Sequence, residues 1–267
     1  MKANFSTTLA AVTLNYDLAG RQTAVTGTSA GNYVTSVTAY DNANRVTGIT
    51  QTTGTTTLET FTYTYDAADR VTGYTGPEGT LNYTYDNTNQ LTGASGARNE
   101  TYTYDANGNR TMTGYSTGTG NRLSSDGTYN YTYDNEGNLT TQTTIANNAK
   151  TYYYWDYRNR LTEVVVKNSA GSTITDDVFT YDVENRRIGK SMNGTQSWTA
   201  YDGVNPYADF NSGGSLTMRY VDGLAIDQMF ARYDGSTVAW CHRAPQIRPP
   251  LSAPKLGRGM GVHKIPV

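Results

Sequence analysis

The chain contains 267 residues, of which 36% are hydrophobic and 16% are charged, and its formal net charge is -2. This composition is typical neither of a coiled coil nor of a charge-rich disordered protein, and the single cysteine excludes an internal disulfide. Residues 1–240 carry 16 Lys and Arg against 23 Asp and Glu, a net-acidic body that gives no support to nucleic-acid binding, which requires a basic surface.

Strand-forming residues dominate the chain from its beginning. It has 23 tyrosines and is rich in threonine, and both residues favour β-strands, whereas the helix formers Glu, Lys and Met are scarce. No apolar run approaches the ~20 residues of a membrane span, and residues 1–14 lack the apolar core of a signal peptide. An all-β fold is therefore expected.

An aromatic residue followed by aspartate recurs nine times, at intervals of 19 to 29 residues. A period of this length indicates a repeat architecture, in which each unit buries its apolar face against its neighbours. The nine dipeptides are Tyr16-Asp17, Tyr40-Asp41, Tyr65-Asp66, Tyr85-Asp86, Tyr104-Asp105, Tyr133-Asp134, Trp155-Asp156, Tyr181-Asp182 and Tyr201-Asp202.

Each repeat predicts a β-hairpin, most clearly at residues 61–75, FTYTYDAADRVTGYT. Phe61, Tyr63 and Tyr65 alternate with threonines, which places the aromatic rings on one face of a strand. A four-residue break begins at Asp66, and strand-forming residues resume after it.

The third residue after each repeated aspartate is always Gly, Asn or Asp. These are the residue types that most readily adopt positive φ, so we predict a left-handed residue closing a type I turn, with the aspartate at the first turn position. The nine residues at this position are Gly20, Asn44, Asp69, Asn89, Gly108, Gly137, Asn159, Asn185 and Asn205.

Arginine follows that position in five repeats and, after one inserted residue, in a sixth. A row of arginines could bind anions, but an ion pair from each arginine to the aspartate of its own turn is the simpler interpretation, and we favour it. The arginines are Arg21, Arg45, Arg70, Arg160, Arg186 and, after the insertion, Arg110.

Nine hairpins supply about 18 strands, and at roughly 4.8 Å per strand a flat sheet would be some 80–90 Å wide with a bare aromatic face. Strand twist and the need to cover that face predict that the repeated antiparallel hairpins form a curled or spiralling ribbon, or pair with another molecule.

The repeat pattern becomes irregular after the ninth repeat, although residues 219–235 still resemble two strands joined by a turn. After Trp240 the composition changes abruptly: residues 241–267 contain five basic residues, five of the seven prolines, and no Thr, Tyr, Asp or Glu. We therefore divide the chain into a repeat region, 1–240, with its nine repeats over about 14–206, and a divergent tail, 241–267, which we expect to be disordered or loosely packed.

The motifs YDANGNR at 104–110 and YDNEGN at 133–138 resemble the Tyr-Asp-x-x-Gly-Asn-Arg pattern of the YD-repeat proteins, the Rhs and teneurin-like group. The resemblance covers about residues 14–235. It implies a long β-hairpin ribbon that spirals into a hollow shell. In bacterial polymorphic toxins that shell encloses a C-terminal toxin, and in animal relatives it forms part of a cell-adhesion protein. An extracellular or cell-envelope location is implied as well.

Residues 181–235 resemble the stretch that leads into the Rhs core, but the sequence departs from that pattern at Cys241. It also contains no Asp-Pro, the dipeptide of the family's self-cleavage segment. Self-cleavage and toxin activity are therefore not expected. We interpret the tail as the frameshifted or recombined end of a longer ancestor, because the composition breaks at Trp240.

Catalytic chemistry has few candidates in this sequence. With no His or Cys before Cys241, the repeat region cannot build a Ser-His-Asp, Cys-His or His/Cys zinc site. Most carboxylates belong to the repeated turns, so we expect neither an enzyme nor a cofactor. Residues 105–109, DANGN, resemble the start of a calcium loop, but Arg110 replaces its Gly and Ser116 its bidentate Glu. A turn without metal is expected there.

The sequence thus predicts a non-catalytic structural protein, a fragment of an Rhs/YD-repeat shell without the core and the toxin. Its expected partners are a toxin domain or other repeat segments of a longer chain. The alternative is a cell-surface adhesion or carbohydrate-binding module that uses its tyrosine-rich strand faces to bind glycans. Buried tyrosine rows favour the shell, and solvent-facing rows favour the glycan-binding module.

Overall fold

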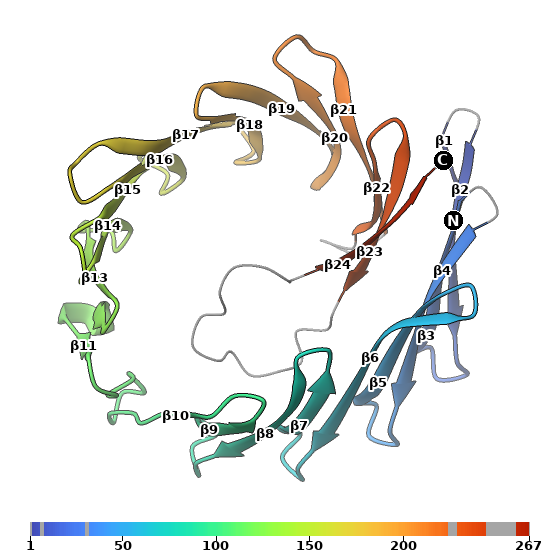
Figure 1. The fold of residues 1–267 in the computed structure, drawn as a ribbon, viewed down its shortest axis with the longest axis horizontal. Helices are drawn as coiled ribbons and strands as arrows, with labels where there is room; N and C mark the ends of the chain where they lie inside the picture. The colour runs from blue at the N-terminus through green and yellow to red at the C-terminus, as the bar shows by residue number, and fades with distance from the viewer. Residues whose placement is uncertain (1, 6–7, 30–31, 224–228, 244–259, 267) are drawn as a thin grey trace. The chain divides into compact units, whose positions relative to one another are not determined.

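The computed structural model describes residues 2–5, 8–29, 32–223, 229–243 and 260–266. These residues form 24 β-strands and one short 3-10 turn, η1 (Thr119–Asn121), with no α-helix among them (Figure 1). The predicted all-β fold of repeated antiparallel hairpins is therefore confirmed. The chain divides into two compact units: unit 1 comprises residues 1–101 and 218–267, and unit 2 comprises residues 102–217.

The strands of unit 1 pair antiparallel with their neighbours in sequence, β1 to β10 in one series and β21 to β24 in another. The first series is β1 (Lys2–Phe5), β2 (Thr8–Tyr16), β3 (Gln22–Ser29), β4 (Asn32–Tyr40), β5 (Val46–Thr53), β6 (Thr56–Tyr65), β7 (Val71–Gly76), β8 (Gly79–Tyr85), β9 (Leu91–Gly96) and β10 (Glu100–Thr101). The second is β21 (Leu216–Asp222), β22 (Met229–Tyr233), β23 (Thr237–Arg243) and β24 (Met260–Pro266). Strand β21 begins at Leu216, two residues before the second segment of unit 1.

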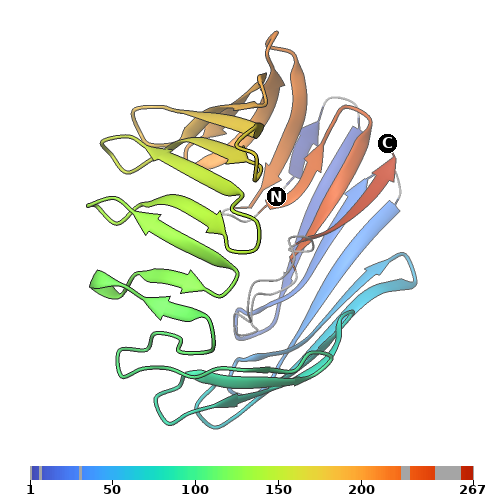
Figure 2. The same cartoon turned by 60° about the vertical axis from the view of Figure 1, so that its left-hand side comes forward.

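Unit 2 contains ten strands in the same sequential antiparallel order. Figure 2 shows its consecutive hairpins side by side in green and yellow, with their turns along two edges. The strands are β11 (Tyr115–Thr117), β12 (Leu123–Asp126), β13 (Tyr129–Tyr133), β14 (Leu139–Thr144), β15 (Lys150–Trp155), β16 (Leu161–Lys167), β17 (Thr173–Tyr181), β18 (Arg187–Met192), β19 (Thr195–Asp202) and β20 (Asn205–Asn211).

The alternation predicted for the hairpin at 61–75 is present in β6. Phe61 and Tyr63 are each 4% exposed, whereas the threonines on either side of Tyr63 are exposed. The Tyr63 ring centroid lies 5.7 Å from that of Tyr74 on β7, in a tilted contact that is favourable for aromatic pairs. The aromatic face is therefore the buried face of this hairpin.

The opposite face carries pairs of hydroxyl side chains. Thr64 and Thr72 lie across one hairpin from each other, with 3.2 Å between their Oγ1 atoms. Pairs with the same spacing of eight residues are Thr84–Thr92, Thr103–Thr111, Ser116–Ser124 and Thr132–Thr140. These cross-strand hydrogen bonds explain part of the threonine content, since a branched hydroxyl residue both favours a strand and satisfies its partner.

The second series of unit 1 packs against the first through one apolar cluster, which we call the closing cluster. Figure 1 draws β22 and β23 beside β2 and β4. The cluster consists of Val12, Val34, Val221, Ala231, Val238 and Trp240, with Leu14, Val25, Leu58, Phe230 and Tyr233 packed around it. Gly27 on β3 allows this contact, because a Cβ atom there would overlap the Trp240 ring.

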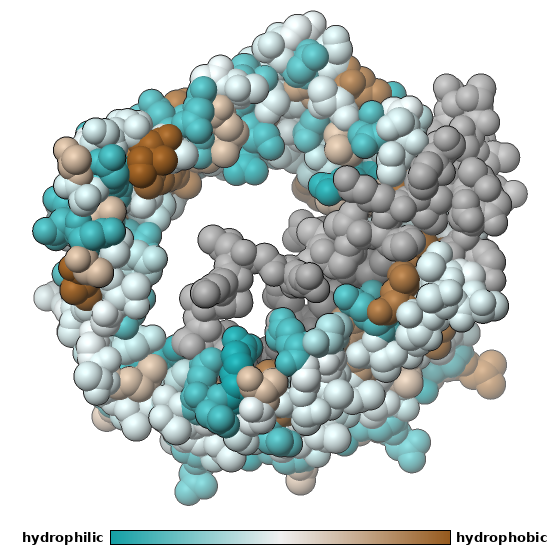
Figure 3. Space-filling view, in the orientation of Figure 1, coloured by the Kyte–Doolittle hydropathy of each residue, from teal (hydrophilic) through white to brown (hydrophobic). Residues whose placement is uncertain are grey.

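Unit 2 buries fewer of its hydrophobic side chains than unit 1 does. Among its described hydrophobic side chains, Tyr102, Val165 and Ala208 are buried, and several large ones, such as Tyr154 and Ile174, are exposed. On the face drawn in Figure 3, the hydrophobic side chains form small separate patches within a mainly polar surface.

The tail differs from its prediction in two stretches. Strand β23 continues to Arg243, three residues past the boundary drawn at Trp240, and β24 pairs antiparallel with it over seven residues. Backbone pairing therefore extends the sheet where composition predicts disorder. Residues 244–259 and 267 lie outside the described residues, and the boundary at residue 240 stays a prediction.

Candidate functional site: the ladder of Tyr-Asp turns

The repeated aspartate organises its turn through backbone hydrogen bonds, as the turn at Asp66 shows. Its Oδ1 accepts from the backbone N–H groups of Ala68 (2.9 Å) and Arg70 (3.0 Å), and its carbonyl accepts from the N–H of Asp69 (3.2 Å). The Asp66 N–H donates to the carbonyl of Arg70 (3.0 Å). A register shift at Tyr65 marks a β-bulge, as in three-residue hairpin loops with a type I turn.

The left-handed conformation predicted three residues after the aspartate is observed in eight of the nine repeats. Their φ angles lie between 57° and 94°. The eight residues are Gly20, Asn44, Asp69, Asn89, Gly108, Gly137, Asn159 and Asn185. The prediction is confirmed for these turns.

The prediction is wrong for Asn205. This residue is the first of β20, and the registers Asp202↔Asn205 and Tyr201↔Pro206 leave a two-residue loop. Gly203 takes the positive φ there, at 59°. A glycine directly after the aspartate allows the shorter loop, so Tyr201 pairs with a residue one position earlier than the equivalent aromatic residue does in the standard turn.

Each arginine forms the expected ion pair with its own turn. Arg45 Nε lies 2.7 Å from Asp41 Oδ2, and Arg70 Nε lies 2.7 Å from Asp66 Oδ2. The same contact occurs in the turns of Arg21, Arg160 and Arg186. The predicted intra-turn ion pair is therefore present in all five repeats with this spacing.

The arginine also reaches forward to the next turn, a contact that sequence reasoning missed. Arg45 Nη1 donates to the Asp66 carbonyl (3.0 Å) and to Asp69 Oδ1 (2.8 Å), and its guanidinium carbon lies 4.8 Å from the centroid of the Tyr65 ring. Arg21, Arg70 and Arg160 repeat all three contacts, and Arg186 keeps the stacking and one carbonyl contact. These guanidinium groups already contact protein acceptors, which favours the structural interpretation of the arginine row over an anion-binding row.

In seven of the nine repeats the aromatic residue reaches back in the opposite direction. Tyr65 Oη donates to the Val46 carbonyl of the preceding repeat at 2.6 Å. Six further aromatic residues make the equivalent bond, Trp155 through its indole Nε1: Tyr40, Tyr85, Tyr133, Trp155, Tyr181 and Tyr201. Successive turns are thus joined twice, and we call the whole set of contacts the turn ladder.

A tenth turn of this kind was missed by the search for the aromatic-Asp dipeptide. Gly118 stands at the aspartate position, its N–H donates to the Arg122 carbonyl, and Asn121 has a φ of 56°. Arg122 Nη1 donates to the Asp134 carbonyl at 2.9 Å, as in the other forward links. The available signal was Asn121-Arg122-Leu123, which matches Asn159-Arg160-Leu161.

The contacts between turns differ where another residue stands at the position of the arginine. Among the described residues, Gln90 bonds only within its own turn, whereas Asn109 and Asn138 bond their own aspartate and also reach an asparagine of the next turn. Arg110 instead stacks on Tyr102, 4.5 Å from the ring centroid. The calcium-like stretch 105–109 is an ordinary turn of this series.

The hydrogen bonds lower the pKa of the turn aspartates. The backbone N–H of Arg21 is the largest cause at Asp17, and that of Arg45 is the largest at Asp41. At Asp66, burial alone would raise the pKa, but the backbone N–H and side chain of Arg70 outweigh it. The pKa is lowered likewise at Asp86, Asp105, Asp134, Asp156 and Asp182. Ionised aspartate is therefore the form that the folded turns favour.

No group of three or more His, Cys, Asp or Glu side chains in the part of the chain that is described is placed to hold a metal ion. Within the same ranges, no helix is long and apolar enough to cross a membrane.

Replacing Tyr65 by phenylalanine is expected to lower the free energy of unfolding by about 1 kcal/mol, because the Val46 carbonyl loses its partner while the ring keeps its packing. Urea denaturation measures the change. Tyr16→Phe is the matched control, since the Tyr16 side chain is 58% exposed and its hydroxyl has no hydrogen bond to the described residues. Equal losses in the two variants would contradict the backward link.

A family model described as Teneurin YD-shell matches residues 6–201 of the chain. Among solved structures, the chain is similar to the Photorhabdus luminescens Tc holotoxin pore carrying the TccC3 mutation D651A, with 17% identity, a TM-score of 0.45, and coverage of 88% of this chain and 15% of that one. The crystal structure of TcdB2-TccC3 matches with 11% identity, a TM-score of 0.30 and the same coverage. A porin-like protein from Bacteroides uniformis matches with 12% identity, a TM-score of 0.25, and coverage of 90% and 89%. No curated protein matches the chain.

Proposed function

Because the chain belongs to the teneurin YD-shell family, we propose that it is a non-catalytic wall segment of a YD-repeat shell, of the kind that encloses a C-terminal toxin. The chain spans about 15% of the length of the Tc toxin chains that it matches. It would therefore supply part of such a wall, and the rest would come from further repeats.

The turn ladder is the observation that carries this proposal. A wall must hold its shape along a whole row of hairpins, and backbone pairing alone leaves the turns free to fray. Here the forward arginine link and the backward tyrosine bond join successive turns along most of the row, at the edge of the sheet. Such nearest-neighbour contacts are what stabilise repeat proteins.

In the hairpins of unit 1, the burial of tyrosine favours the wall over the glycan-binding alternative. Tyr63, Tyr74 and Tyr83 are at most 5% exposed, so their rings serve packing and offer no open stacking platform. A glycan array with this protein is expected to give no binding above that of a Tyr→Ala control. Tyrosine-dependent binding on the array would support the adhesion or carbohydrate-binding module instead.

Enclosure implies a toxin domain as partner and a secreted or cell-surface location, and a transplant tests it. In this experiment, residues 14–206 of the chain are substituted for nine repeats of a YD-repeat toxin shell. The resistance of the enclosed toxin domain to protease is then measured. Protection equal to that of the parent shell supports the proposal. A shell that assembles but leaves its cargo digestible would overturn enclosure. A second transplant with Arg45→Ala and Arg70→Ala is expected to lose protection, because two forward links are cut.

A further inference from the structure

Unit 2 contains two lysines that face each other without a counter-charge. Lys150 on β15 and Lys167 on β16 are direct cross-strand partners. Like charges in this position destabilise a sheet, and the registers place threonines beside them, Thr143 next to Lys150 and Thr173 next to Lys167. Within the described parts of the chain, neither lysine is in an ion pair with a carboxylate. The arginines of the turn ladder, in contrast, are paired.

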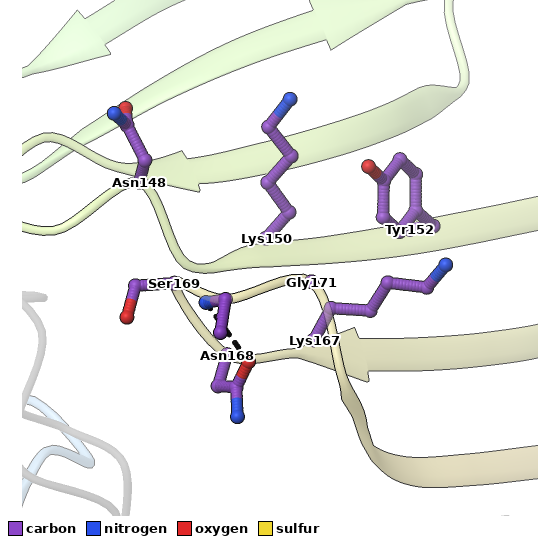
Figure 4. A pocket seen from close by; sticks show the side chains of 8 residues that line it. Asn148, Lys150, Tyr152, Lys167, Asn168, Ser169 and Gly171 are labelled. Atoms are coloured by element: carbon purple, nitrogen blue, oxygen red, sulfur yellow. Dashed lines mark hydrogen bonds between the residues drawn. The ribbon is translucent and has the colours of Figure 1, made fainter.

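The lysine pair borders an open hollow of about 470 Å³, a size within the range of small-molecule sites. Its lining is completed by Asn148, Tyr152 and the loop residues 168–171. Figure 4 shows Asn148, Lys150, Tyr152 and Lys167 extending to the same side of the two strands, whereas the side chains of Asn168 and Ser169 point away. The hollow therefore combines two cations, a phenol and an amide on one side.

Two of these groups contact each other. Lys167 Nζ lies 5.6 Å from the centroid of the Tyr152 ring, within cation-π range. The loop after β16 is held by Asn168, whose Oδ1 accepts from the N–H groups of Ala170 and Ser172, each at 3.0 Å. The site is thus partly ordered before any ligand arrives, which lowers the entropic cost of binding.

We propose that this hollow binds a small anionic molecule through a phosphate, sulfate or carboxylate group that bridges Lys150 and Lys167. Directly opposed strand residues have Cα atoms about 4.5–5.5 Å apart, so two ammonium groups can reach different oxygens of one anion. The anion would remove the like-charge repulsion and gain two charge-assisted hydrogen bonds. Tyr152 and Asn148 would contact the remainder of the molecule.

The test is an NMR titration of the whole ¹⁵N-labelled protein with inorganic phosphate, inorganic sulfate and citrate, each at constant ionic strength. Saturable shifts at 148–152 and 167–171 are expected, with dissociation constants of about 1 mM. Phosphate and sulfate binding without citrate would assign an oxyanion ester, and citrate binding would assign a carboxylate ligand. The absence of a saturable shift with all three probes would overturn the proposal.

Lys150→Gln and Lys167→Gln are each expected to weaken binding about tenfold or more, since a hydrogen bond to a charged group is lost. Lys190→Gln is the matched control because Lys190 lies on β18 of the same unit, opposite Phe179. It should keep the affinity within about twofold. In anion-free buffer Lys150→Gln is expected to raise the unfolding temperature by relieving the repulsion. If Lys190→Gln weakened anion binding as much as the other two variants, the loss of affinity would follow from net charge alone. That result would refute the site.

Discussion

Replacing Trp240 by alanine is expected to lower the free energy of unfolding of unit 1 by about 3–5 kcal/mol, which is the range for removing a buried aromatic side chain. The side chain is 3% exposed and lies in the closing cluster, between β23 and the strands of the first series. Its loss opens a cavity between segments that no turn joins directly. Urea denaturation followed by hydrogen exchange of the unit 1 amides measures the loss.

Trp198→Ala in unit 2 is the control for this variant. That side chain is 40% exposed, so its removal should cost clearly less and should leave exchange in unit 1 unchanged. A wild-type exchange pattern in Trp240→Ala would contradict the packing of the two series of unit 1 through this cluster.

Gly27→Ala provides an independent check of the same contact. The added methyl group would overlap the Trp240 ring, and overpacking of this kind costs about 1–3 kcal/mol. In the Trp240→Ala background the methyl group has room, so Gly27→Ala should cost little there. A double-mutant cycle in urea measures the coupling, and strict additivity would mean that the two residues do not touch.

Acidification below about pH 4 is expected to destabilise the protein, because the eight turn aspartates lose their charge as the pH falls. Their pKa values in the folded state lie below the ordinary value of 3.8. The unfolded chain therefore binds more protons than the folded one as the pH falls. The stabilisation is complete well above 3.8 and is lost as the pH passes down through the folded pKa values. Urea midpoints at pH 7, 5, 4 and 3 measure the effect.

Asp66→Asn separates charge from turn geometry in this experiment. Asn168 already holds an equivalent turn through two backbone N–H groups, so the variant should keep the turn and lose the ion pair with Arg70. Its stability should vary less with pH than that of the wild type, whereas Asp66→Ala should be less stable at every pH. Asp202→Asn is the control, since the Asp202 carboxylate accepts no hydrogen bond from the described residues. An acid profile unchanged in Asp66→Asn would mean that the turn aspartates are not responsible.

Sequence reasoning succeeded where the cause is local. The positive φ at Asp69 follows from the steric limits of one residue and the hydrogen bonds of one aspartate, and nine copies made the pattern visible. The same reasoning failed at Asn205, because Gly203 offers a competing turn that the repeat average hides. It missed the turn at Gly118 because the search required an aromatic-Asp dipeptide, which this turn lacks.

The contacts between repeats could not be predicted from the sequence. The forward link of Arg45 depends on the distance between neighbouring turns, which the strand register sets and no single repeat contains. The packing of Trp240 over Gly27 joins residues more than two hundred positions apart, and only the folded chain shows that the glycine is there to admit a ring. The hollow beside Lys150 likewise requires the register that places Lys167 opposite it.

The turn ladder has a direction, because each arginine donates toward the C-terminus and each tyrosine donates toward the N-terminus. Every standard unit therefore offers the same donors and acceptors at its two sides, whatever its place in the row. Unequal recombination that deletes or duplicates one such unit would join partners that already fit, with no compensating substitution. A row of such hairpins could thus gain or lose whole units, and the unit ending in Gln90, which makes no forward link to the described residues, is a place where that exchange would leave a mismatch.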